Sequence, residues 1–185
     1  MITGKIQKLI LIVIVLCLVL PGCGTMETGE AEITFFDIGY GDSILIKSPD
    51  EEFVLIDTGY PRAGETLIGL LEEKNVATLE YLIVTHPHPD HLGNAVRIVR
   101  KFRPERLRDN GETIDTFDER LTEEMAREYR RKFRGHPAYE VLKAGDRIEL
   151  GPIILKVIWP PGIDPERDWN ANSLAFILKY GDFRA

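Results

Sequence analysis

The chain has 185 residues and a formal net charge of −7 at pH 7, with 44% hydrophobic and 29% charged residues. This length and balance are typical of one globular domain and exclude a disordered or collagen-like chain. The acidic charge gives no overall attraction for nucleic acid. Both cysteines, Cys17 and Cys23, lie near the N-terminus, so a domain that follows them has no disulfide or thiolate metal ligand.

Residues 1–23 have the layout of a secretory signal. Lys5 and Lys8 form a short basic start, and an unbroken apolar run follows over residues 9–20. This run is too short to cross a bilayer comfortably, which favours a signal peptide over a spanning helix. An uncleaved membrane anchor is the alternative, and both interpretations place the domain outside the cytoplasm.

The end of this segment, LPGC at residues 20–23, resembles the lipobox of bacterial lipoproteins. That resemblance implies lipidation of Cys23 and attachment of the mature protein to a membrane. Residues 24–30 are polar and contain glycine, so we expect a flexible tether between the lipid and the domain. The sequence therefore predicts a membrane-anchored lipoprotein whose domain covers residues 31–185.

The domain itself alternates between strand and helix signatures, which predicts a layered α/β or α+β fold. The first three strands are close neighbours and indicate an antiparallel meander. The charge-rich stretch 113–134 predicts one solvated surface helix. The other predicted elements are strands at 33–36, 43–46, 53–56, 81–84, 139–142, 153–158 and 174–179, and helices at 64–73 and about 93–102.

A locally basic run, RIVRKFRPERLR, occupies residues 97–108. Its arginines and lysine are of the type that contacts phosphates. A solvated helix face followed by a loop explains the same run, and we favour that interpretation.

Three of the four histidines fall in THPHPDH at residues 85–91, directly after the predicted strand 81–84. Residues two apart on an extended segment point to the same side, so His86 and His88 are candidate ligands of one metal ion. Asp90 and His91 are the candidate ligands of a second ion. Neutral imidazoles and a carboxylate suit zinc, and also manganese or iron. A surface histidine turn without metal is the alternative.

Two neighbouring ions would activate water and stabilise the anionic transition state of hydrolysis. Asp90 is also the candidate catalytic residue, because its second oxygen could act on protons of the attacking water. Two Asp- and Gly-rich strand ends, at 36–43 and 56–59, offer carboxylates that could orient the histidines. The candidates for this supporting role are Asp37 and Asp42 in the first strand end and Asp57 in the second. Asn172 and Ser173 are candidates for lining the pocket.

Each of these supporting candidates also has a plain structural explanation. The aspartates could cap ordinary β-turns, and Asn172 and Ser173 could form a strand-entry turn.

Taken together, these motifs resemble the metallo-β-lactamase superfamily, and in particular the extracellular domain of ComEC-type DNA-uptake competence proteins and their stand-alone relatives. The pattern His-x-His-x-Asp-His is matched in full. FDIGYGDS resembles that subfamily's FDVGQGDS and departs from it at Tyr40, where glutamine is usual. Further similar stretches, in the same order, are LIDTG at 55–59, YEVLKAGDRIELG at 139–151 and NANSLAFILKYGDFR at 170–184.

The resemblance implies an αββα sandwich with a binuclear metal site at one edge of the sheets. It also implies hydrolysis, with phosphodiester bonds of nucleic acid favoured over a β-lactam. The family pattern continues with a Thr-Gly-Asp segment, whose aspartate bridges the metals, and a His-His-Gly-Ser segment that supplies a last histidine. Neither segment lies within residues 1–185, so we expect an incomplete domain. The alternatives are a non-catalytic surface lipoprotein that uses the fold for binding, and an inactive gene fragment.

Overall fold

The computed structural model describes residues 29–114 and 121–185. The predicted signal peptide, Cys23 and all but the last two residues of the predicted tether lie outside the described residues. Within the described ranges, no helix is sufficiently long and apolar to cross a membrane.

The first sheet contains six strands in the order β1-β2-β3-β4-β5-β6. The first three strands pair antiparallel, which confirms the predicted meander, and β3 to β6 pair parallel. The β3 strand is buried at all four positions, as expected for a strand covered on both faces. The bounds are β1 Glu32–Phe35, β2 Ile44–Lys47, β3 Phe53–Ile56, β4 Tyr81–Val84, β5 Arg106–Asp109 and β6 Tyr139–Val141.

The second sheet contains four antiparallel strands in the order β10-β9-β8-β7. In this sheet β7 and β8 alternate between buried and less buried positions, and β7 is buried only at Ile148 and Leu150. This alternation is typical of a sheet that packs one face on a core. The bounds are β7 Arg147–Leu150, β8 Ile153–Trp159, β9 Ala175–Tyr180 and β10 Phe183–Arg184.

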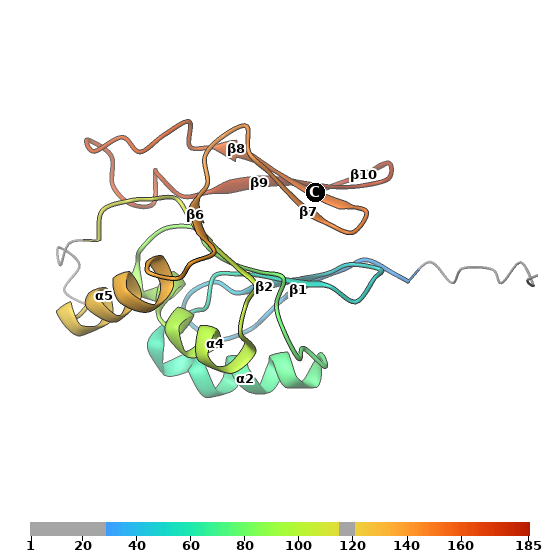
Figure 1. The fold of residues 1–185 in the computed structure, drawn as a ribbon, viewed down its shortest axis with the longest axis horizontal. Helices are drawn as coiled ribbons and strands as arrows, with labels where there is room; N and C mark the ends of the chain where they lie inside the picture. The colour runs from blue at the N-terminus through green and yellow to red at the C-terminus, as the bar shows by residue number, and fades with distance from the viewer. Residues whose placement is uncertain (1–28, 115–120) are drawn as a thin grey trace, which may run out of the picture.

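Helices cover the face of the first sheet that points away from the second sheet (Figure 1). One apolar core lies between these helices and the first sheet, and a second core lies between the two sheets. The described residues therefore build the helix, sheet and sheet layers of a sandwich. The helical segments are η1 Pro61–Ala63, α2 Gly64–Glu73, α3 Pro89–Leu92, α4 Ala95–Phe102, α5 Glu123–Tyr129 and η2 Arg130–Arg134.

The basic run 97–108 divides between α4 and β5, so its predicted loop is a strand. Periodicity missed β5 because Arg106 and Arg108 alternate with Leu107 and resemble a solvated segment. The aliphatic part of a long arginine side chain can cover apolar surface, which lets Arg108 be buried inside a strand. The sequence also did not predict β7 and the short β10.

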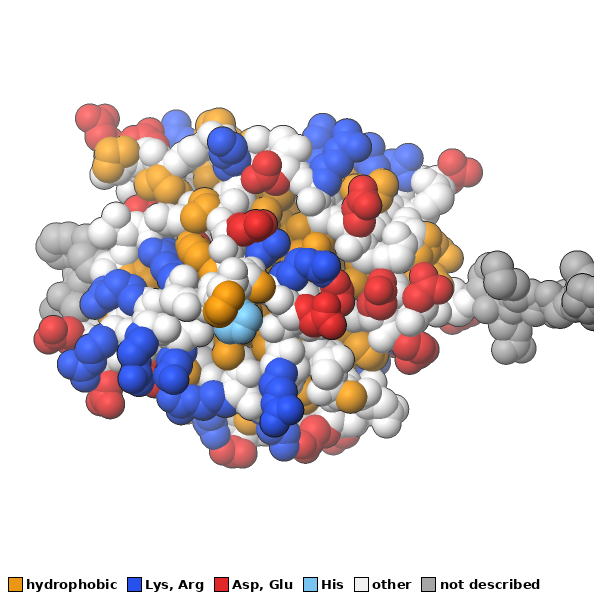
Figure 2. Space-filling view, viewed as in Figure 1, with side chains coloured by type: hydrophobic (Ala, Val, Ile, Leu, Met, Phe, Trp, Pro, Cys, Tyr) orange, Lys and Arg blue, Asp and Glu red, His pale blue; other side chains and the backbone are white. Residues whose placement is uncertain are grey.

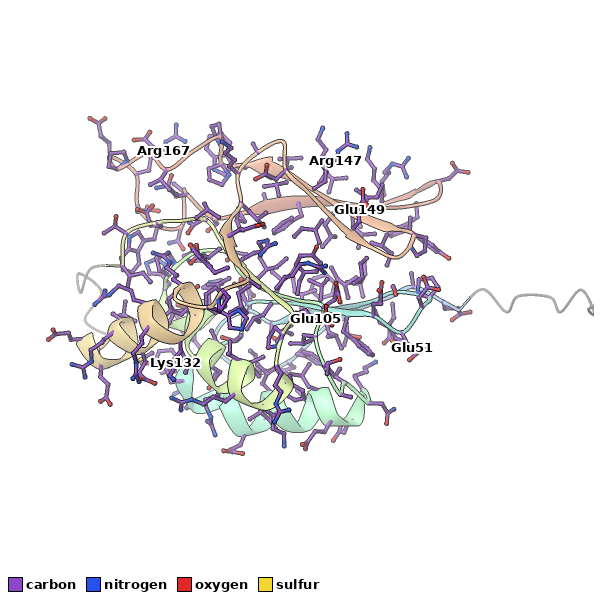
Figure 3. All side chains as sticks on the ribbon, viewed as in Figure 1. Glu51, Glu105, Lys132, Arg147, Glu149 and Arg167 are labelled. Atoms are coloured by element: carbon purple, nitrogen blue, oxygen red, sulfur yellow. The ribbon has the colours of Figure 1, made fainter. Side chains whose placement is uncertain are left out.

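Basic side chains gather over the helical layer, around α4, α5 and η2 (Figure 2). Figure 3 shows Lys132 projecting from this layer. Many of the bases have acidic partners: Arg100 pairs with Glu128 at 2.7 Å, and Lys101 pairs with Glu72 at 2.5 Å. This pairing supports a solvated helix face rather than a dedicated phosphate-binding surface.

Candidate metal centre

The histidine cluster lies where β4 ends. The chain leaves the strand at Val84, bends through residues 85–88 and begins α3 at Pro89. Proline suits the first position of a helix because its ring fixes φ and no amide hydrogen is needed there. Thr58 donates two hydrogen bonds to the carbonyl of His91, one from its backbone N–H at 2.7 Å and one from its hydroxyl at 2.8 Å. These bonds hold α3 against the end of β3.

His86 and His88 form the first pair of candidate ligands. Nε2 of His86 lies 2.9 Å from Nδ1 of His88. The bend after β4 thus brings together two ring nitrogens from residues two apart. Two imidazole nitrogens on one tetrahedral zinc ion would lie roughly 3.3 Å apart, since each Zn–N bond is about 2.0–2.1 Å. A small outward movement of the two rings would therefore admit an ion.

Asp90 and His91 form the second pair. Oδ2 of Asp90 lies 3.9 Å from Nε2 of His91. The other oxygen of Asp90, Oδ1, is buried and has no hydrogen-bond partner among the described residues. A buried carboxylate oxygen without a partner is costly unless a cation or water satisfies it, so this atom fits a metal ligand.

Asp57, at the end of β3, connects the two pairs. It is 2% exposed and has a φ of 61°, in the left-handed region that aspartate tolerates better than most residues. Its Oδ1 accepts the backbone N–H of Thr85 at 2.7 Å. Its Oδ2 accepts the hydroxyl of Thr85 at 2.7 Å and lies 2.8 Å from Nδ1 of His91.

These contacts define which ring nitrogens carry protons. A carboxylate accepts hydrogen bonds only, so Nδ1 of His91 donates to Asp57 and Nε2 of His91 keeps its lone pair. The Thr85 hydroxyl donates to Asp57, so its oxygen can only accept from Nδ1 of His86, 3.0 Å away. Nε2 of His86 therefore also keeps its lone pair, and it faces His88. One buried carboxylate thus leaves a metal-binding nitrogen on two of the three rings.

The two rings that Asp57 orients have pKa values shifted in opposite directions. Burial, together with the neighbouring His91 and His88, lowers the pKa of His86 to about 3. Burial also acts to lower the pKa of His91, but the hydrogen bond and the charge of Asp57 outweigh it and raise that pKa. His86 is therefore the imidazole that stays neutral in mildly acidic solution, as a metal ligand must be.

The lowered pKa of His86 predicts a stability that falls with acidification in the metal-free protein. The unfolded chain takes up a proton on His86 near pH 6.5, whereas the folded chain does so only near pH 3. The contribution of His86 is therefore present above pH 6.5 and is lost as the pH falls towards 3. Urea unfolding in EDTA measures the free energy of unfolding at each pH. Between pH 7.5 and pH 5 this free energy should fall less in His86→Asn than in the wild type.

The raised pKa of His91 acts in the opposite direction. Its contribution is present below about pH 6.5 and is lost as the pH rises through its raised pKa. His91→Asn should therefore show a steeper loss of stability between pH 7.5 and pH 5 than the wild type. Identical pH dependences for the wild type and both variants would contradict this assignment.

The loop between β8 and β9 covers the first pair from the second sheet. Oγ of Ser173 lies 2.9 Å from Nδ1 of His86, and Oδ1 of Asn170 lies 3.2 Å from Nδ1 of His88. The ring of Trp169 packs on His88 with centroids 5.1 Å apart. Figure 3 shows Arg167 on the same loop. The structure thus brings the predicted pocket residue Ser173 to the histidines.

Asn172 does not reach the histidines. It is fully buried, and its amide donates to Oε2 of Glu112 at 2.6 Å and to the carbonyl of Asp164 at 2.9 Å. Its own carbonyl accepts from Nδ2 of Asn110 at 2.9 Å. The side chain therefore anchors the loop rather than lining the pocket, which corrects the predicted role.

Of the two aspartates predicted in the first Gly-rich turn, only Asp42 approaches the cluster. Its Oδ2 lies 4.0 Å from Nδ1 of His91, and its side chain is 71% exposed. Asp37 is exposed, and its Oδ1 accepts from the backbone N–H of Gly39 at 3.3 Å. Asp37 thus has the plain turn-capping role that was its alternative explanation.

Loss of the Asn172 anchor should destabilise the protein. Asn172→Ala would leave the buried carboxylate of Glu112 without this donor, so we expect unfolding to become easier by about 1–3 kcal/mol. Glu166→Ala, at an exposed position of the same loop, should change stability by less than about 0.5 kcal/mol. Urea denaturation measures both, and equal effects of the two substitutions would show that the loop is not anchored in this way.

The candidate ligands form two pairs rather than one triad. Among the residues that the structure describes, no three His, Cys, Asp or Glu side chains converge closely enough to hold one ion. A catalytic zinc site has three protein ligands and one open position, so each described pair supplies one ligand fewer than such a site uses. The partnerless oxygen of Asp90 and the facing nitrogens of His86 and His88 are the observations that fit metal.

A cleft with a volume of about 370 Å³ opens beside the cluster. Apolar side chains of both sheets line most of it, and its polar residues are Asp42, Asp57, Thr85, His86, His91 and Ser173. A concave, mostly apolar site with a few convergent polar groups is typical of a substrate pocket.

Two contributors were missed at the sequence level. Thr85 connects Asp57 to His86, and its signal was available, since it is a hydroxyl residue at a strand end directly before the histidines. Trp169 packs on His88 from a residue far away in the sequence, and no local pattern indicates that contact.

Comparisons with known proteins agree with this geometry. Residues 37–167 match the family model of the metallo-β-lactamase superfamily. The chain therefore belongs to this superfamily, whose membership supports a metal-dependent hydrolase. Among curated proteins, it is 27% identical over 172 residues to ComE operon protein 3 of Bacillus subtilis (strain 168). That alignment covers 83% of this chain and 21% of the relative, so the chain spans about a fifth of its length.

Solved metallo-β-lactamases have the same fold. A subclass B3 enzyme from a soil metagenome library matches with a TM-score of 0.58 and 15% identity, over 85% of this chain and 58% of that one. A subclass B3 enzyme of Bradyrhizobium japonicum matches with a TM-score of 0.54 and 19% identity, over 83% and 57%. A metallo-β-lactamase from Staphylococcus aureus subsp. aureus COL matches with a TM-score of 0.52 and 21% identity, over 83% of this chain and 40% of that one. Identities this low establish the fold alone.

Proposed function

We propose that this protein is an extracytoplasmic hydrolase with a binuclear metal site that cleaves phosphodiester bonds of nucleic acid. The observation that carries the proposal is the partnerless buried oxygen of Asp90 beside the facing nitrogens of His86 and His88. The similarity to ComE operon protein 3 and the competence-type motifs of the sequence favour nucleic acid over a β-lactam.

In this proposal His86 and His88 hold one ion, and Asp90 and His91 hold the other. When bound, two divalent ions, zinc in the first place and manganese or iron as alternatives, supply the Lewis acidity that activates water at neutral pH and stabilises negative charge. Asp57 orients His91 directly and His86 through Thr85. An oxygen of Asp90 that does not bind metal can accept a proton from the attacking water.

The location is also a proposal. It rests on the signal-like segment 1–23 and on Cys23 as the lipidated residue, which would attach the domain to a membrane. Labelling of cells with a radioactive fatty acid should mark the wild-type protein and not Cys23→Ser. Equal labelling of both would overturn the lipid anchor and leave the hydrolase proposal untouched.

The activity is tested on the full chain with zinc or manganese. Single-stranded DNA, duplex DNA, RNA and bis(p-nitrophenyl) phosphate should include at least one cleaved substrate, whereas a chromogenic cephalosporin should remain intact. Asp90→Asn keeps the size of the side chain but removes its charge, so it should abolish cleavage. Cleavage that persists in Asp90→Asn, or that occurs only on the cephalosporin, would overturn the proposal.

A second candidate function is a non-catalytic surface lipoprotein that uses the fold to bind a partner. The observation that favours it is that, in the described part of the chain, the ligands converge in pairs and not in threes. A protein that binds oligonucleotides with the same affinity in zinc and in EDTA and cleaves none of the substrates would fit this candidate.

A further inference from the structure

The first pair of candidate ligands is one protein ligand short of a catalytic zinc site. Within the described ranges, no further His, Cys, Asp or Glu joins His86 and His88 around one ion. An amide oxygen does reach them, from the loop between β8 and β9. Oδ1 of Asn170 lies 3.2 Å from Nδ1 of His88, and the same nitrogen lies 2.9 Å from Nε2 of His86.

The amide of Asn170 reaches both rings. Burial is the largest influence on the pKa of His86 and lowers it, whereas a hydrogen bond with the side chain of Asn170 acts to raise it. A partner raises the pKa of a histidine by accepting a hydrogen bond from the ring, so the amide presents its oxygen to His86. That oxygen therefore gathers with the facing nitrogens of the two rings.

The lone pairs of these groups converge on one position. Nε2 of His86 has no proton, because its Nδ1 donates to Thr85, so the short contact with His88 needs a proton on Nδ1 of His88. Oδ1 of Asn170 is a second acceptor for that proton. A cation that takes the place of the proton, which leaves to solvent, meets three lone pairs.

The spacing of these atoms also suits an ion. Neighbouring ligand atoms on a tetrahedral zinc ion lie roughly 3.3 Å apart, since each bond is about 2.0–2.1 Å. The contact of 3.2 Å between Asn170 and His88 is already near this value, whereas the contact of 2.9 Å between His86 and His88 is shorter. The two rings therefore move apart slightly to admit an ion, and the amide oxygen stays where it is.

Backbone hydrogen bonds hold Asn170 in this place. Its carbonyl accepts from the N–H of Ser173 at 3.1 Å, and the N–H of Leu174 donates to the carbonyl of Thr85 at 3.1 Å. The buried anchor Asn172 lies between these contacts. The side chain of Asn170 is itself exposed, so a substitution there removes no core packing.

We propose that Asn170 is the third protein ligand of the ion held by His86 and His88 and binds that ion through Oδ1. This inference rests on the proposed metal-dependent function and adds a ligand from the second sheet to a site built on the first. A carbonyl oxygen suits manganese better than a third imidazole would. The preference of this site for zinc over manganese is therefore weaker than that of a three-histidine site.

The test measures metal affinity in the full-length chain with Asp90→Ala, which leaves the first pair intact. Competition with a chromophoric chelator gives the affinities for zinc and for manganese. Asn170→Ala should lower zinc affinity at least about 10-fold, no less than the loss of a group that only orients a ligand. Asn170→Asp keeps an oxygen in place and should bind zinc at least as tightly as the background. Asn170→His should raise the ratio of zinc to manganese affinity.

A spectroscopic readout separates a ligand from a residue that only orients His88. The visible absorption of bound Co²⁺ depends on the atoms that coordinate the ion, so it should change in Asn170→Ala and in Asn170→His. Glu166→Ala, at an exposed position of the same loop, is the control and should keep both the spectrum and the affinity of the background.

These readouts are independent of catalysis. Loss of zinc affinity in Asn170→Ala with recovery in Asn170→Asp or Asn170→His supports the assignment, even if the wild type cleaves no phosphodiester. Unchanged affinity in Asn170→Ala, no recovery in either of the other variants, an unchanged Co²⁺ spectrum, or no metal bound by the background overturns it, even if the wild type cleaves DNA.

Discussion

Asp57→Asn should lower the affinity of the protein for zinc by about 10- to 100-fold, the range found when a group that orients a histidine ligand is removed. The carboxylate of Asp57 accepts from Thr85 and from His91. An asparagine amide would place a donor opposite either the Thr85 N–H or the pair formed by the Thr85 hydroxyl and His91, so the network that orients the rings would lose at least one hydrogen bond and the charge of the carboxylate. Competition with a chromophoric chelator measures the affinity.

Two further variants separate the carboxylate from the backbone. Asp57→Gly relieves the positive φ of 61° but removes the carboxylate, so it should lose zinc affinity like Asp57→Asn. Asp37→Asn, at an exposed turn position, should bind zinc as the wild type does. Wild-type affinity in both Asp57 variants would show that the histidines do not depend on this residue.

Asp109→Ala should destabilise the protein by about 3–5 kcal/mol, the cost typical of removing one partner from a buried ion pair. Asp109 is 1% exposed and accepts from Nε of Arg134 at 2.7 Å, from the hydroxyl of Tyr139 at 2.7 Å and from the hydroxyl of Tyr129 at 3.0 Å. Burial and the charge of Asp109 raise the pKa of both tyrosines, so they stay protonated and donate to it.

The measurement is urea unfolding at pH 7, followed by circular dichroism. Asp182→Ala, at an exposed position between β9 and β10, is the matched control and should change stability by less than about 0.5 kcal/mol. Asp109 joins β5 to α5 and η2, so its loss should also loosen that helical segment. A change below about 1 kcal/mol in Asp109→Ala would contradict its role as the hub of this layer.

The sequence predicted the candidate ligands because they are local. His86, His88, Asp90 and His91 occur within six residues, and the strand before them was predicted with the bounds that the structure has, Tyr81–Val84. Helix α2 was likewise predicted over Gly64–Glu73, because its leucines recur at helical spacing. Where the candidate ligands or the hydrophobic periodicity lie within one short segment, the sequence alone is sufficient to predict the site residues or the element.

The supporting contacts are not local and could not be read in this way. Ser173 reaches His86 from 87 positions later, and Asn172 reaches Glu112 from 60 positions later. Two adjacent polar residues, Asn172 and Ser173, therefore received one prediction although their side chains point to different partners. β5 was missed for a similar reason, since its arginines look solvated until the neighbouring strands that cover them are known.

The fold class was predicted because the order of elements restricts it. Three adjacent strands, then alternating helices and strands, predict a layered α/β or α+β domain, and the structure confirms this. The strand order and the division into two sheets depend on pairings between distant segments, such as β3 with β4 and β5 with β6. Those pairings follow from tertiary packing and not from propensity.

The central claim is that the cluster at residues 86–91 binds metal, and zinc content tests it most directly. The wild-type chain, His86→Ala, Asp90→Ala and the double variant His86→Ala/His91→Ala would be equilibrated with zinc and analysed by plasma mass spectrometry. We predict about two equivalents in the wild type, about one in each single variant and about none in the double variant. Zinc in the wild type no higher than in the double variant would contradict the account.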